Sequence, residues 1–305
     1  MRVLIVGGSG MFGHRAALEF ASAGGFDLHV TVRRAVPARF VAPGATYHED
    51  VDLAGGSAAA ARVLKDLAPD IVVNAVGAIK QRDLEAAVDE SYFLNGALPH
   101  LLALLNPNPS GRVFHISTDC VFRGDKGAYT EVDQPDVQDL YGRSKAVGEL
   151  GYGRHLTLRT SIVGFEIGGH LGLVSWFFSQ PPASVLRGFT HARYSGLTTG
   201  MVSRLMVALA READPPTGLW HVASEPITKF DLLARLSAAF DLGHRLVPDD
   251  RERIDRTLDD SRFRTRTGSR RPSWDELITD LRRDWERWPY AGLYASRRAA
   301  TRNLP

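Results

Sequence analysis

The sequence predicts an α/β protein in which a doubly wound parallel sheet is joined to a smaller α/β domain. Short apolar, β-branched runs alternate with helical patterns in the first half of the chain, as in parallel sheets covered by helices on both faces. A glycine-rich turn follows the first run, and after about residue 165 the alternation gives way to a different pattern. We therefore expect a sheet domain over residues 1–165, with parts of 192–225, and a second domain formed mainly by residues 166–305.

Five short runs are the predicted strands of the sheet. They are RVLIV at 2–6, DLHVTV at 27–32, DIVVNAV at 70–76, RVFHIST at 112–118 and HLTLRTS at 155–161. Their nearly continuous apolar character predicts strands that are buried on both faces. Helical patterns lie between the early runs, at 12–24 and 58–68.

The second half of the chain carries a different pattern. Helices are predicted at 172–182, 228–240 and 273–288, and a polar, arginine-rich stretch occupies 249–271. We expect these segments to form the smaller domain.

Composition narrows the classes of protein that fit. The chain has 305 residues, of which 44% are hydrophobic and 24% charged, as in an ordinary soluble globular protein. A formal net charge of +2 does not favour a nucleic-acid partner. Cys120 is the single cysteine, which excludes an internal disulfide framework and fits a reducing compartment. The first apolar run is too short for a signal peptide or a membrane span, so we expect a cytoplasmic protein without a membrane partner.

Metal binding is not predicted. The ten histidines are scattered along the chain, and no His or Cys cluster has the spacing of a metal site.

The glycine cluster VGGSGMFG stands between the first predicted strand and the first predicted helix. Gly8, Gly10 and Gly13 satisfy G-x-G-x-x-G, and Gly7 begins an overlapping G-x-x-G-x-x-G. Glycines let the backbone turn tightly and approach a pyrophosphate, whose charge is met by the N–H groups at the helix N-terminus. A simple turn is the alternative, but the strand and helix context favours a Rossmann dinucleotide site. The predicted contacts are Gly7, Gly10, Met11, Phe12 and Gly13.

The end of the second predicted strand indicates which dinucleotide is bound. A carboxylate there would hold the ribose 2′-hydroxyl of NAD, but the sequence has Arg33 and Arg34, which suit the 2′-phosphate of NADP. Solvated surface arginines are the alternative, so NADP(H) is preferred and NAD(H) remains possible. The other predicted contacts on the adenosine side are Asp50, Val51, Asn74, Ala75, Val76 and Gly77.

Tyr141 and Lys145 are the ends of the segment YGRSK and lie four residues apart. In a helix this spacing places both side chains on one face, with a rise of about 6 Å between them. A lysine ammonium near a phenol lowers the tyrosine pKa, so that the phenol can give or take a proton near neutral pH. The spacing also arises by chance, so its context decides.

That context is a hydroxyl pair at the end of a predicted sheet strand. Ser117 and Thr118 open the segment STDCVFRGDKGAYTEVD, and each offers a hydroxyl that can hydrogen-bond a substrate carbonyl. The alternative is that both are strand-end caps. In open α/β sheets, ligands bind at the edge where the strands end. The hydroxyl pair, the glycine cluster and YGRSK therefore point to one site.

Together these motifs resemble the extended short-chain dehydrogenase/reductase superfamily. Within it, the chain is similar to the dTDP-4-dehydrorhamnose reductase family, through STDCVFRG at 117–124, YGRSKAVGE at 141–149, LTLRTSIVG at 156–164 and DRTLDDSRF at 255–263. The resemblance implies hydride transfer from NAD(P)H to the keto carbon of a nucleotide-linked 4-keto-6-deoxyhexose. It implies that Tyr141 gives the proton, that Lys145 lowers the tyrosine pKa and holds the nicotinamide ribose, and that Thr118 polarises the carbonyl.

The resemblance extends to supporting residues. It implies that Asn95 supports the lysine through water, although a partly buried polar helix residue is the alternative. It also places the backbone of Thr160, Ser161 and Ile162 near the carboxamide of the cofactor. One departure concerns Cys120, which stands where family dehydratases have the glutamate of an acidic pair. Dehydration of the sugar is therefore disfavoured.

The substrate's diphosphate requires cations. The candidates are Arg187, Arg193 and Arg256 in the second domain, although arginine is common in this chain and surface positions are the alternative. Lys80, after the third predicted strand, is expected to face the substrate. The partner expected from the resemblance is a nucleotide sugar, and a homodimer is possible. Two rival functions remain open: an epimerase that retains its cofactor, and a regulatory subunit that binds NADP without catalysis.

Overall fold

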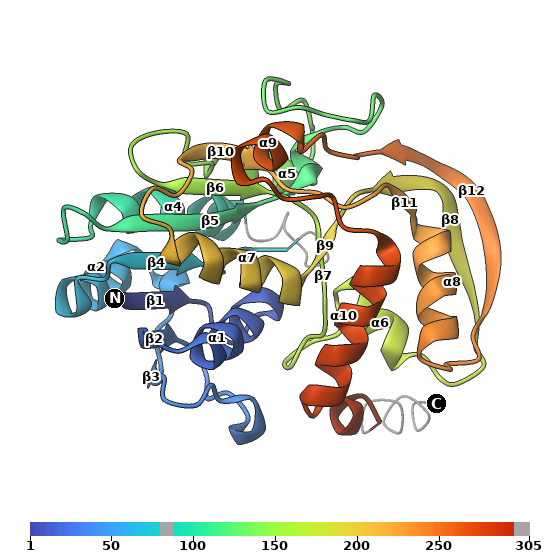
Figure 1. Ribbon diagram of the computed structural model, residues 1–305, viewed down its shortest axis with the longest axis horizontal. Coiled ribbons are helices and arrows are strands. Elements are labelled where there is room, and N and C mark those ends of the chain that lie inside the picture. Colours follow the sequence, from blue (N-terminus) through green and yellow to red (C-terminus); the bar gives the residue numbers. More distant parts are fainter. Residues whose placement is uncertain (80–87, 296–305) are drawn as a thin grey trace.

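The structure, a computed structural model, describes residues 1–79 and 88–295 and contains a seven-stranded parallel sheet (Figure 1). Its strands are β1 (Arg2–Val6), β2 (Asp27–Thr31), β3 (Thr46–His48), β4 (Ile71–Asn74), β5 (Arg112–Ser117), β6 (Leu156–Arg159) and β10 (Gly218–His221). They follow the order β10-β6-β5-β4-β1-β2-β3, and every neighbouring pair is parallel. The predicted doubly wound α/β fold is confirmed, and all five predicted strands lie in this sheet.

The structure contains helices that cover both faces of the main sheet and others that pack elsewhere. They include α1 (Met11–Ala23), α2 (Ser57–Leu67), α3 (Val88–Tyr92), a π-helix (Phe93–Ala97), α4 (Leu98–Leu104), α5 (Leu140–Val147), α6 (Leu173–Ser179), α7 (Thr199–Arg211), α8 (Lys229–Ala239), α9 (Ser261–Thr267) and α10 (Trp274–Arg287). Short 3₁₀ helices occupy Ala38–Phe40, Leu53–Gly55 and Asp119–Val121. In Figure 1, α1, α7 and α10 lie side by side in front of the sheet, and the pairs α1 with α7 and α7 with α10 are in contact.

The alternation of side chains along β1 shows why the sheet needs two covering layers. Val3 and Ile5 belong to the hydrophobic core that includes residues of α1 and α7. Leu4 and Val6 belong to a second core that includes residues of α2 and α4. Because successive side chains of a strand point to opposite faces, a strand that is apolar throughout is buried on both sides.

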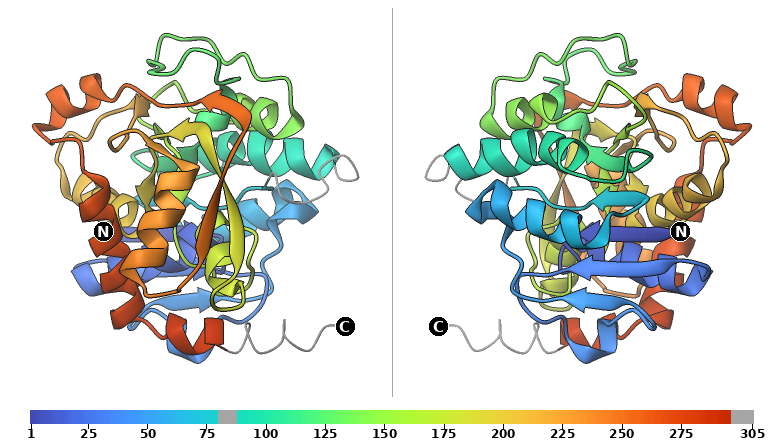
Figure 2. Two further views of the ribbon diagram at one scale, coloured as in Figure 1. Left: turned by 90° about the vertical axis from the view of Figure 1, so that its right-hand side faces the viewer. Right: turned by 90° about the vertical axis from the view of Figure 1, so that its left-hand side faces the viewer.

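A smaller sheet lies beside the main one and is formed by later segments of the chain (Figure 2). Its strands are β11 (Ile227–Thr228), β8 (Val185–Tyr194) and β12 (Arg245–Asp255), in that order. β8 pairs antiparallel with β11 and parallel with β12, and α8 packs against β8. A two-stranded pair of β7 (Ile162–Val163) and β9 (Leu197–Thr198) lies between the segments. None of these five strands was predicted, and neither were β3 and β10 of the main sheet.

The segment between the two sheets contributes to both. β10 forms one edge of the main sheet, and α7 packs against α1, whereas β11 belongs to the smaller sheet. The core is continuous across this region, because Phe165, Phe177 and Phe178 join the same buried cluster as β1 and α1. In residues 1–79 and 88–295, no helix has the length and apolar character needed to cross a membrane.

Candidate active site

The glycine turn after β1 is shaped for the close approach of a ligand. Gly7 has a φ of 88°, a region that favours glycine, and its backbone is packed against the segment after β4. A Cβ on Gly13 would stand 2.1 Å from the carbonyl oxygen of Gly7, so only glycine allows α1 to begin so close to β1. At Gly10 the nearest atom to an added Cβ lies 3.4 Å away, an ordinary van der Waals contact, so this position has room that Gly13 lacks.

The N-terminus of α1 provides donors at this turn. Gly10 is its N-cap and supplies no side-chain cap, so the first-turn N–H groups are left for a ligand or solvent. This arrangement fits the pyrophosphate of a dinucleotide. Of the two side chains predicted here, Phe12 packs into the hydrophobic core, so only its backbone can serve a ligand. The sulfur of Met11 lies near Gly172, which precedes α6.

The expected adenosine side is assembled from the ends of β2, β3 and β4. Val51 N–H donates to the carbonyl of Val32 at 3.1 Å, which brings Asp50 close to the exposed Arg33 and Arg34. Asp50 has a φ of 56°, which is uncommon for a residue other than glycine. The structure thus gathers these four predicted residues at one corner of the sheet.

The segment after β4 closes over the glycine turn. Ala75 N–H donates to the carbonyl of Val6 at 3.0 Å, and the side-chain oxygen of Asn74 accepts from Val76 N–H at 3.1 Å. A Cβ on Gly7 would stand 2.8 Å from a methyl carbon of Val76. The Asn74 side chain is therefore buried in shaping the turn, and the backbone of this segment faces the glycine turn.

Asn95 lies in the π-helix and ties this segment to α5. Its side-chain oxygen accepts from Ala78 N–H at 2.9 Å, and its amide donates to the Ala78 carbonyl at 3.1 Å and to the Ser144 hydroxyl at 3.0 Å. A Cβ on Gly77 would stand 3.0 Å from that oxygen, and one on Gly148 would stand 1.9 Å from the Asn95 carbonyl. Asn95 thus holds the helix that carries the catalytic candidates through direct bonds. π-Helical turns often mark functional sites.

Tyr141 and Lys145 lie one turn apart on α5, as the spacing predicted. The helix begins at the N-cap Asp139, whose carboxylate accepts from Gly142 N–H at 2.9 Å. The ammonium of Lys145 is buried and donates to the carbonyl of Ile116 on β5 at 2.7 Å. Burial lowers the pKa of Lys145 to about 8, and the nearby carboxylate of Glu149 opposes that shift.

Thr118 follows directly on the carboxyl end of β5, and its hydroxyl lies close enough to the phenol of Tyr141 to act on the pKa of that phenol. The expected acidic phenol is not reproduced here. Burial raises the pKa of Tyr141, the nearby Cys120 adds to the rise at alkaline pH, and the neighbouring Thr118 hydroxyl only partly opposes it. The physical reason is that the phenol is desolvated, while the Lys145 ammonium is directed to the Ile116 carbonyl.

Ser117 corrects a second expectation. Its hydroxyl donates to the carboxylate of Glu149 at 2.6 Å, and the residue is almost fully buried. Successive side chains of a strand point to opposite faces, so Ser117 points away when its neighbour Thr118 faces Tyr141. The structure therefore brings only Thr118 of the hydroxyl pair to the phenol, and Ser117 supports the strand end from behind.

Arg256 reaches the same strand end from the other sheet. Its guanidinium donates to the Phe122 carbonyl at 2.7 Å and to the sulfur of Cys120 at 3.7 Å. Burial raises the pKa of Asp119, and the charge of Arg256 opposes that rise most strongly. Of the three predicted diphosphate ligands, Arg256 is the one whose side chain contacts residues next to Thr118.

Arg193 and Arg187 occupy different places on β8. Arg256 N–H donates to the Arg193 carbonyl at 3.0 Å, so Arg193 is its neighbour, and the Arg193 side chain is half-exposed. Arg187 lies six residues earlier on the same strand, about 20 Å away along an extended chain. It is exposed and lies 3.7 Å from the carboxylate of Asp249. The structure thus does not bring Arg187 to the site. Lys80 lies outside the described residues.

Thr160, Ser161 and Ile162 continue from β6 into β7 at the carboxyl edge of the sheet. The carbonyl of Ser161 accepts from Leu197 N–H at 2.8 Å, and the Thr160 hydroxyl donates to the same carbonyl at 3.1 Å. Ile162 pairs with Leu197 in the short β7 and β9 ladder. The segment is therefore fixed in place beyond the carboxyl end of β6.

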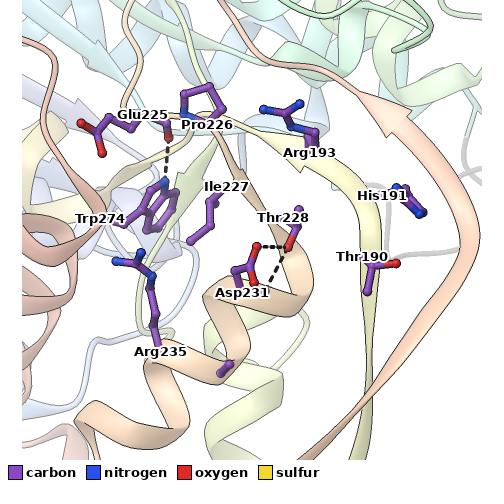
Figure 3. A pocket seen from close by; sticks show the side chains of 11 residues that line it. Thr190, His191, Arg193, Glu225, Pro226, Ile227, Thr228, Asp231, Arg235 and Trp274 are labelled. Carbon is purple, nitrogen blue, oxygen red and sulfur yellow. Dashed lines mark hydrogen bonds between the residues drawn. The ribbon is translucent and has the colours of Figure 1, made fainter.

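A surface cavity of about 520 Å³ lies at the start of α8, apart from the catalytic candidates (Figure 3). Arg193 is the only predicted site residue among its lining residues. The indole of Trp274 donates to the carbonyl of Glu225 at its rim, and Thr228 and Asp231 are bonded to each other. Several of its polar side chains are paired with residues outside the cavity, Arg193 with Asp255 and Arg235 with Asp275.

The sequence analysis missed three residues that contact or charge the site. His14 holds the carbonyl of Gly10, Glu149 accepts from Ser117, and the charge of Lys229 lowers the pKa of Asp119. Helical spacing could have indicated two of them, because His14 follows Gly10 by four residues and Glu149 follows Lys145 by four. Lys229 carries no such signal. In the described part of the chain, no group of three or more His, Cys, Asp or Glu side chains is placed to hold a metal ion.

The sequence of this chain is similar to those of several known proteins. The family profile described as "RmlD substrate binding domain" matches residues 1–239. A dTDP-4-dehydrorhamnose reductase of Burkholderia thailandensis is 31% identical over 168 residues, which cover 53% of this chain and 50% of that protein. Methionine adenosyltransferase 2 subunit beta of Danio rerio is 27% identical over 260 residues, covering 81% and 76%. The matches to the first curated relatives span half or less of their length.

Solved structures share the fold at lower sequence identity. The dTDP-4-dehydrorhamnose reductase of Bacillus anthracis, crystallised in complex with NADP, superposes with a TM-score of 0.74 and 18% identity. The superposition covers 91% of this chain and 96% of that one.

Proposed function

Because the chain belongs to the RmlD substrate binding domain family, we propose that it is an NADPH-dependent reductase acting on the 4-keto group of a nucleotide-linked 4-keto-6-deoxyhexose. The reduced nicotinamide, when bound, supplies the hydride that adds to the carbonyl carbon. A proton added to the carbonyl oxygen completes the alcohol. Each ketone therefore consumes one NADPH and one proton.

The closeness of the Thr118 hydroxyl to the Tyr141 phenol, with Lys145 one turn further along α5, is the observation that carries this proposal. It places two hydroxyls together at the carboxyl end of β5, where a carbonyl oxygen can accept from both. Burial raises the pKa of Tyr141, so the phenol keeps its proton at neutral pH. A protonated phenol is the form that reduction requires, because the carbonyl oxygen gains a proton as negative charge develops on it. Lys145, one turn along α5, completes the set.

The cofactor would lie along the carboxyl edge of the sheet. The room at Gly10 and the uncapped N-terminus of α1 suit its pyrophosphate. The exposed pair Arg33 and Arg34 suits the 2′-phosphate of NADP, which supports a preference for NADPH. Further residues proposed to contact the cofactor are Gly7, Met11, the Phe12 backbone, Gly13, Asp50, Val51, Asn74, Ala75, Val76, Gly77, Tyr141, Lys145, Thr160, Ser161 and Ile162.

The substrate would occupy the region between Thr118 and the smaller sheet. Arg256 reaches the 3₁₀ turn after Thr118, and Arg193 is its neighbour on β8. These two guanidinium groups are the proposed ligands of the diphosphate. The charge of Lys229 also acts on Asp119, so it adds to the positive field on this side.

Two other functions use the same groups. An epimerase would oxidise and then reduce the sugar with one retained cofactor, using the same phenol. The match to methionine adenosyltransferase 2 subunit beta over 81% of this chain favours a second candidate, a subunit of a larger assembly. The catalytic set formed by Thr118, Tyr141 and Lys145 supports an enzyme over that candidate.

The test incubates the purified protein with NADPH and a dTDP-linked 4-keto-6-deoxyhexose and follows the absorbance of NADPH together with the products. Consumption of one NADPH per alcohol formed is the expected result. Sugar conversion without net NADPH consumption would instead indicate epimerisation. Replacing Tyr141→Phe should abolish turnover and leave NADPH binding intact, because it removes only the proton donor. Full turnover by that variant would overturn the proposed role of the phenol.

A further inference from the structure

A buried ion pair lies directly behind the candidate site, and the proposed chemistry does not use it. The carboxylate of Glu149 accepts from the guanidinium of Arg159 at 2.9 Å and 2.5 Å and from the Ser117 hydroxyl at 2.6 Å. The exposed fractions of the two charged side chains are 2% for Arg159 and 9% for Glu149. Burying two charges is costly even when they are paired, so the pair asks for an explanation beyond packing.

The far side of Arg159 is held as firmly as the near side. Its guanidinium contacts the Nε2 of His221 at 3.0 Å, and the Nδ1 of His221 contacts the carbonyl of Tyr129 at 3.0 Å. A carbonyl only accepts, so Nδ1 carries the hydrogen and Nε2 accepts from Arg159. Burial and the charge of Arg159 lower the pKa of His221 to about 3, so the ring stays neutral. Arg159 also lies over the ring of Phe122, 4.9 Å from its centroid.

Glu149 is connected to both parts of the catalytic set. It follows Lys145 by four residues, just beyond the end of α5, and its N–H still donates to the Ala146 carbonyl at 3.3 Å. Its carboxylate holds Ser117, whose neighbours in the chain are Ile116 and Thr118. The Ile116 carbonyl is in turn the acceptor for the Lys145 ammonium at 2.7 Å.

The charges around Lys145 identify Glu149 as its counter-charge. From β5, His115 is buried with a pKa well below its usual value, so it is neutral. From α5, the Tyr141 phenol is protonated, and from β6 the guanidinium of Arg159 is bound to Glu149. Burial lowers the pKa of Lys145, and Glu149 is the carboxylate that raises it.

We propose that Glu149 is a positioning residue for the reduction, which fixes the strand end that carries Thr118 and keeps the Lys145 ammonium protonated at the working pH. The inference rests on the proposed function for its effect on turnover. The electrostatic half of the inference, the effect of Glu149 on the protonation of Lys145, can be measured without turnover. Ser117 links the Glu149 carboxylate to the strand end that carries Thr118, and Arg159 holds the carboxylate in place. We call this positioning of the strand end the geometric half of the inference.

The test removes both charges together, because Glu149→Gln alone leaves Arg159 buried without its counter-charge. The double variant Glu149→Gln/Arg159→Met is labelled with ¹³C at the lysine ε carbons, and the protein is titrated by NMR. The chain has only five lysines, and the signal of Lys145 is assigned by its loss in Lys145→Arg. We expect the midpoint of Lys145 to fall by about one pH unit, as for the loss of a nearby opposite charge. The alkaline limb of kcat/KM should move to lower pH with it.

A matched control is the ion pair between Arg15 on α1 and Asp284 on α10. Its Nε to Oδ2 distance is 2.8 Å, and the two side chains are 3% and 4% exposed. The double variant Asp284→Asn/Arg15→Met should lose thermal stability comparably but leave the Lys145 midpoint unchanged. An unmoved midpoint in the Glu149 variant would overturn the electrostatic half of the inference. If the wild-type protein showed no turnover but the Lys145 midpoint still fell in the Glu149 double variant, only the proposed function would be contradicted.

Two conservative variants keep the inference testable if the double variant does not fold. Glu149→Asp retains the negative charge, so the Lys145 midpoint should stay near the wild-type value. Ser117→Ala retains both charges and removes only the link to the strand end. It should lower kcat several-fold, leave KM for NADPH unchanged and leave the midpoint in place. Wild-type kcat in Ser117→Ala would overturn the geometric half.

Discussion

Thr118 lies close to several residues of the candidate site. Its hydroxyl lies close to the Tyr141 phenol, donates to the carboxylate of Asp119 at 3.2 Å and accepts from Cys120 N–H at 3.1 Å. We predict that Thr118→Val lowers kcat by roughly 10²- to 10³-fold, the range found when one hydrogen-bond donor to a developing oxyanion is removed. The KM for NADPH should change little. Steady-state kinetics with both substrates varied would measure this.

The control for that prediction is Thr118→Ser, which keeps the hydroxyl and removes only a methyl group. It should retain most of the activity. Equal losses of kcat in the serine and valine variants would show that packing, rather than the hydroxyl, is what the site requires at this position.

Motif spacing predicted that Thr118, Tyr141 and Lys145 lie near one another, because helical periodicity and the strand end fix where these residues lie. It was not sufficient for Ser117, because sequence adjacency conceals that neighbouring strand residues face opposite sides. The shift of the Tyr141 pKa was also predicted in the wrong direction, since it is raised and not lowered. That direction depends on how far the phenol is desolvated, which is set by residues distant in the chain.

The turn from β1 into α1 contains glycines with two different roles. Gly13 is needed for packing, whereas Gly10 is proposed to face the cofactor. A Cβ on Gly13 would stand 2.1 Å from the carbonyl oxygen of Gly7, whereas at Gly10 the nearest atom lies 3.4 Å away. We predict that Gly13→Ala lowers the melting temperature and abolishes NADPH binding. Gly10→Ala should fold with nearly wild-type stability and yet bind NADPH weakly, because its added methyl occupies the side proposed for the pyrophosphate.

Thermal unfolding and NADPH titration of both variants would measure these effects. Gly24→Ala tests whether a general loss of glycine matters, since Gly24 has open space around it but a φ of 66°. It should cost some stability through backbone strain and leave NADPH affinity unchanged. If Gly10→Ala bound NADPH normally, the turn would not be the pyrophosphate site.

Five strands of the main sheet, β1, β2, β4, β5 and β6, were predictable because each is a short, largely apolar run that the fold mostly buries. The smaller sheet was not predictable in this way. β12 includes DDRERID, a polar run whose residues are largely exposed, and its partner β8 lies far earlier in the chain. Local sequence gives no period-2 apolar signal there, because much of the strand faces solvent. β3 is only three residues long, which is below the length at which such a pattern is visible.

The last described segment links the two ends of the molecule at the candidate site. Tyr290 lies 276 residues after His14, and its hydroxyl is 2.6 Å from the Nε2 of His14. The Nδ1 of the same ring is 2.7 Å from the carbonyl of Gly10, so the imidazole bridges the tyrosine and the glycine turn. One turn later, the Tyr294 hydroxyl accepts from Glu166 N–H at 3.0 Å and donates to Ser175 at 2.6 Å. Tyr290 is thus linked to the glycine turn, and Tyr294 is linked to Glu166 and α6.

Both contacts fit a neutral His14 ring, in which the Gly10 carbonyl accepts from Nδ1 and the Tyr290 hydroxyl donates to Nε2. Burial lowers the pKa of His14 to about 4, so this state holds at neutral pH. We predict that Tyr290→Phe weakens NADPH binding by about 5- to 10-fold, the effect of one buried hydrogen bond. The matched variant Tyr294→Phe should lower the melting temperature with less effect on NADPH affinity, because its contacts lie away from the glycine turn. Fluorescence titration of both variants with NADPH separates the two, and equal affinities would show that the C-terminal segment stabilises the fold without acting on the cofactor site.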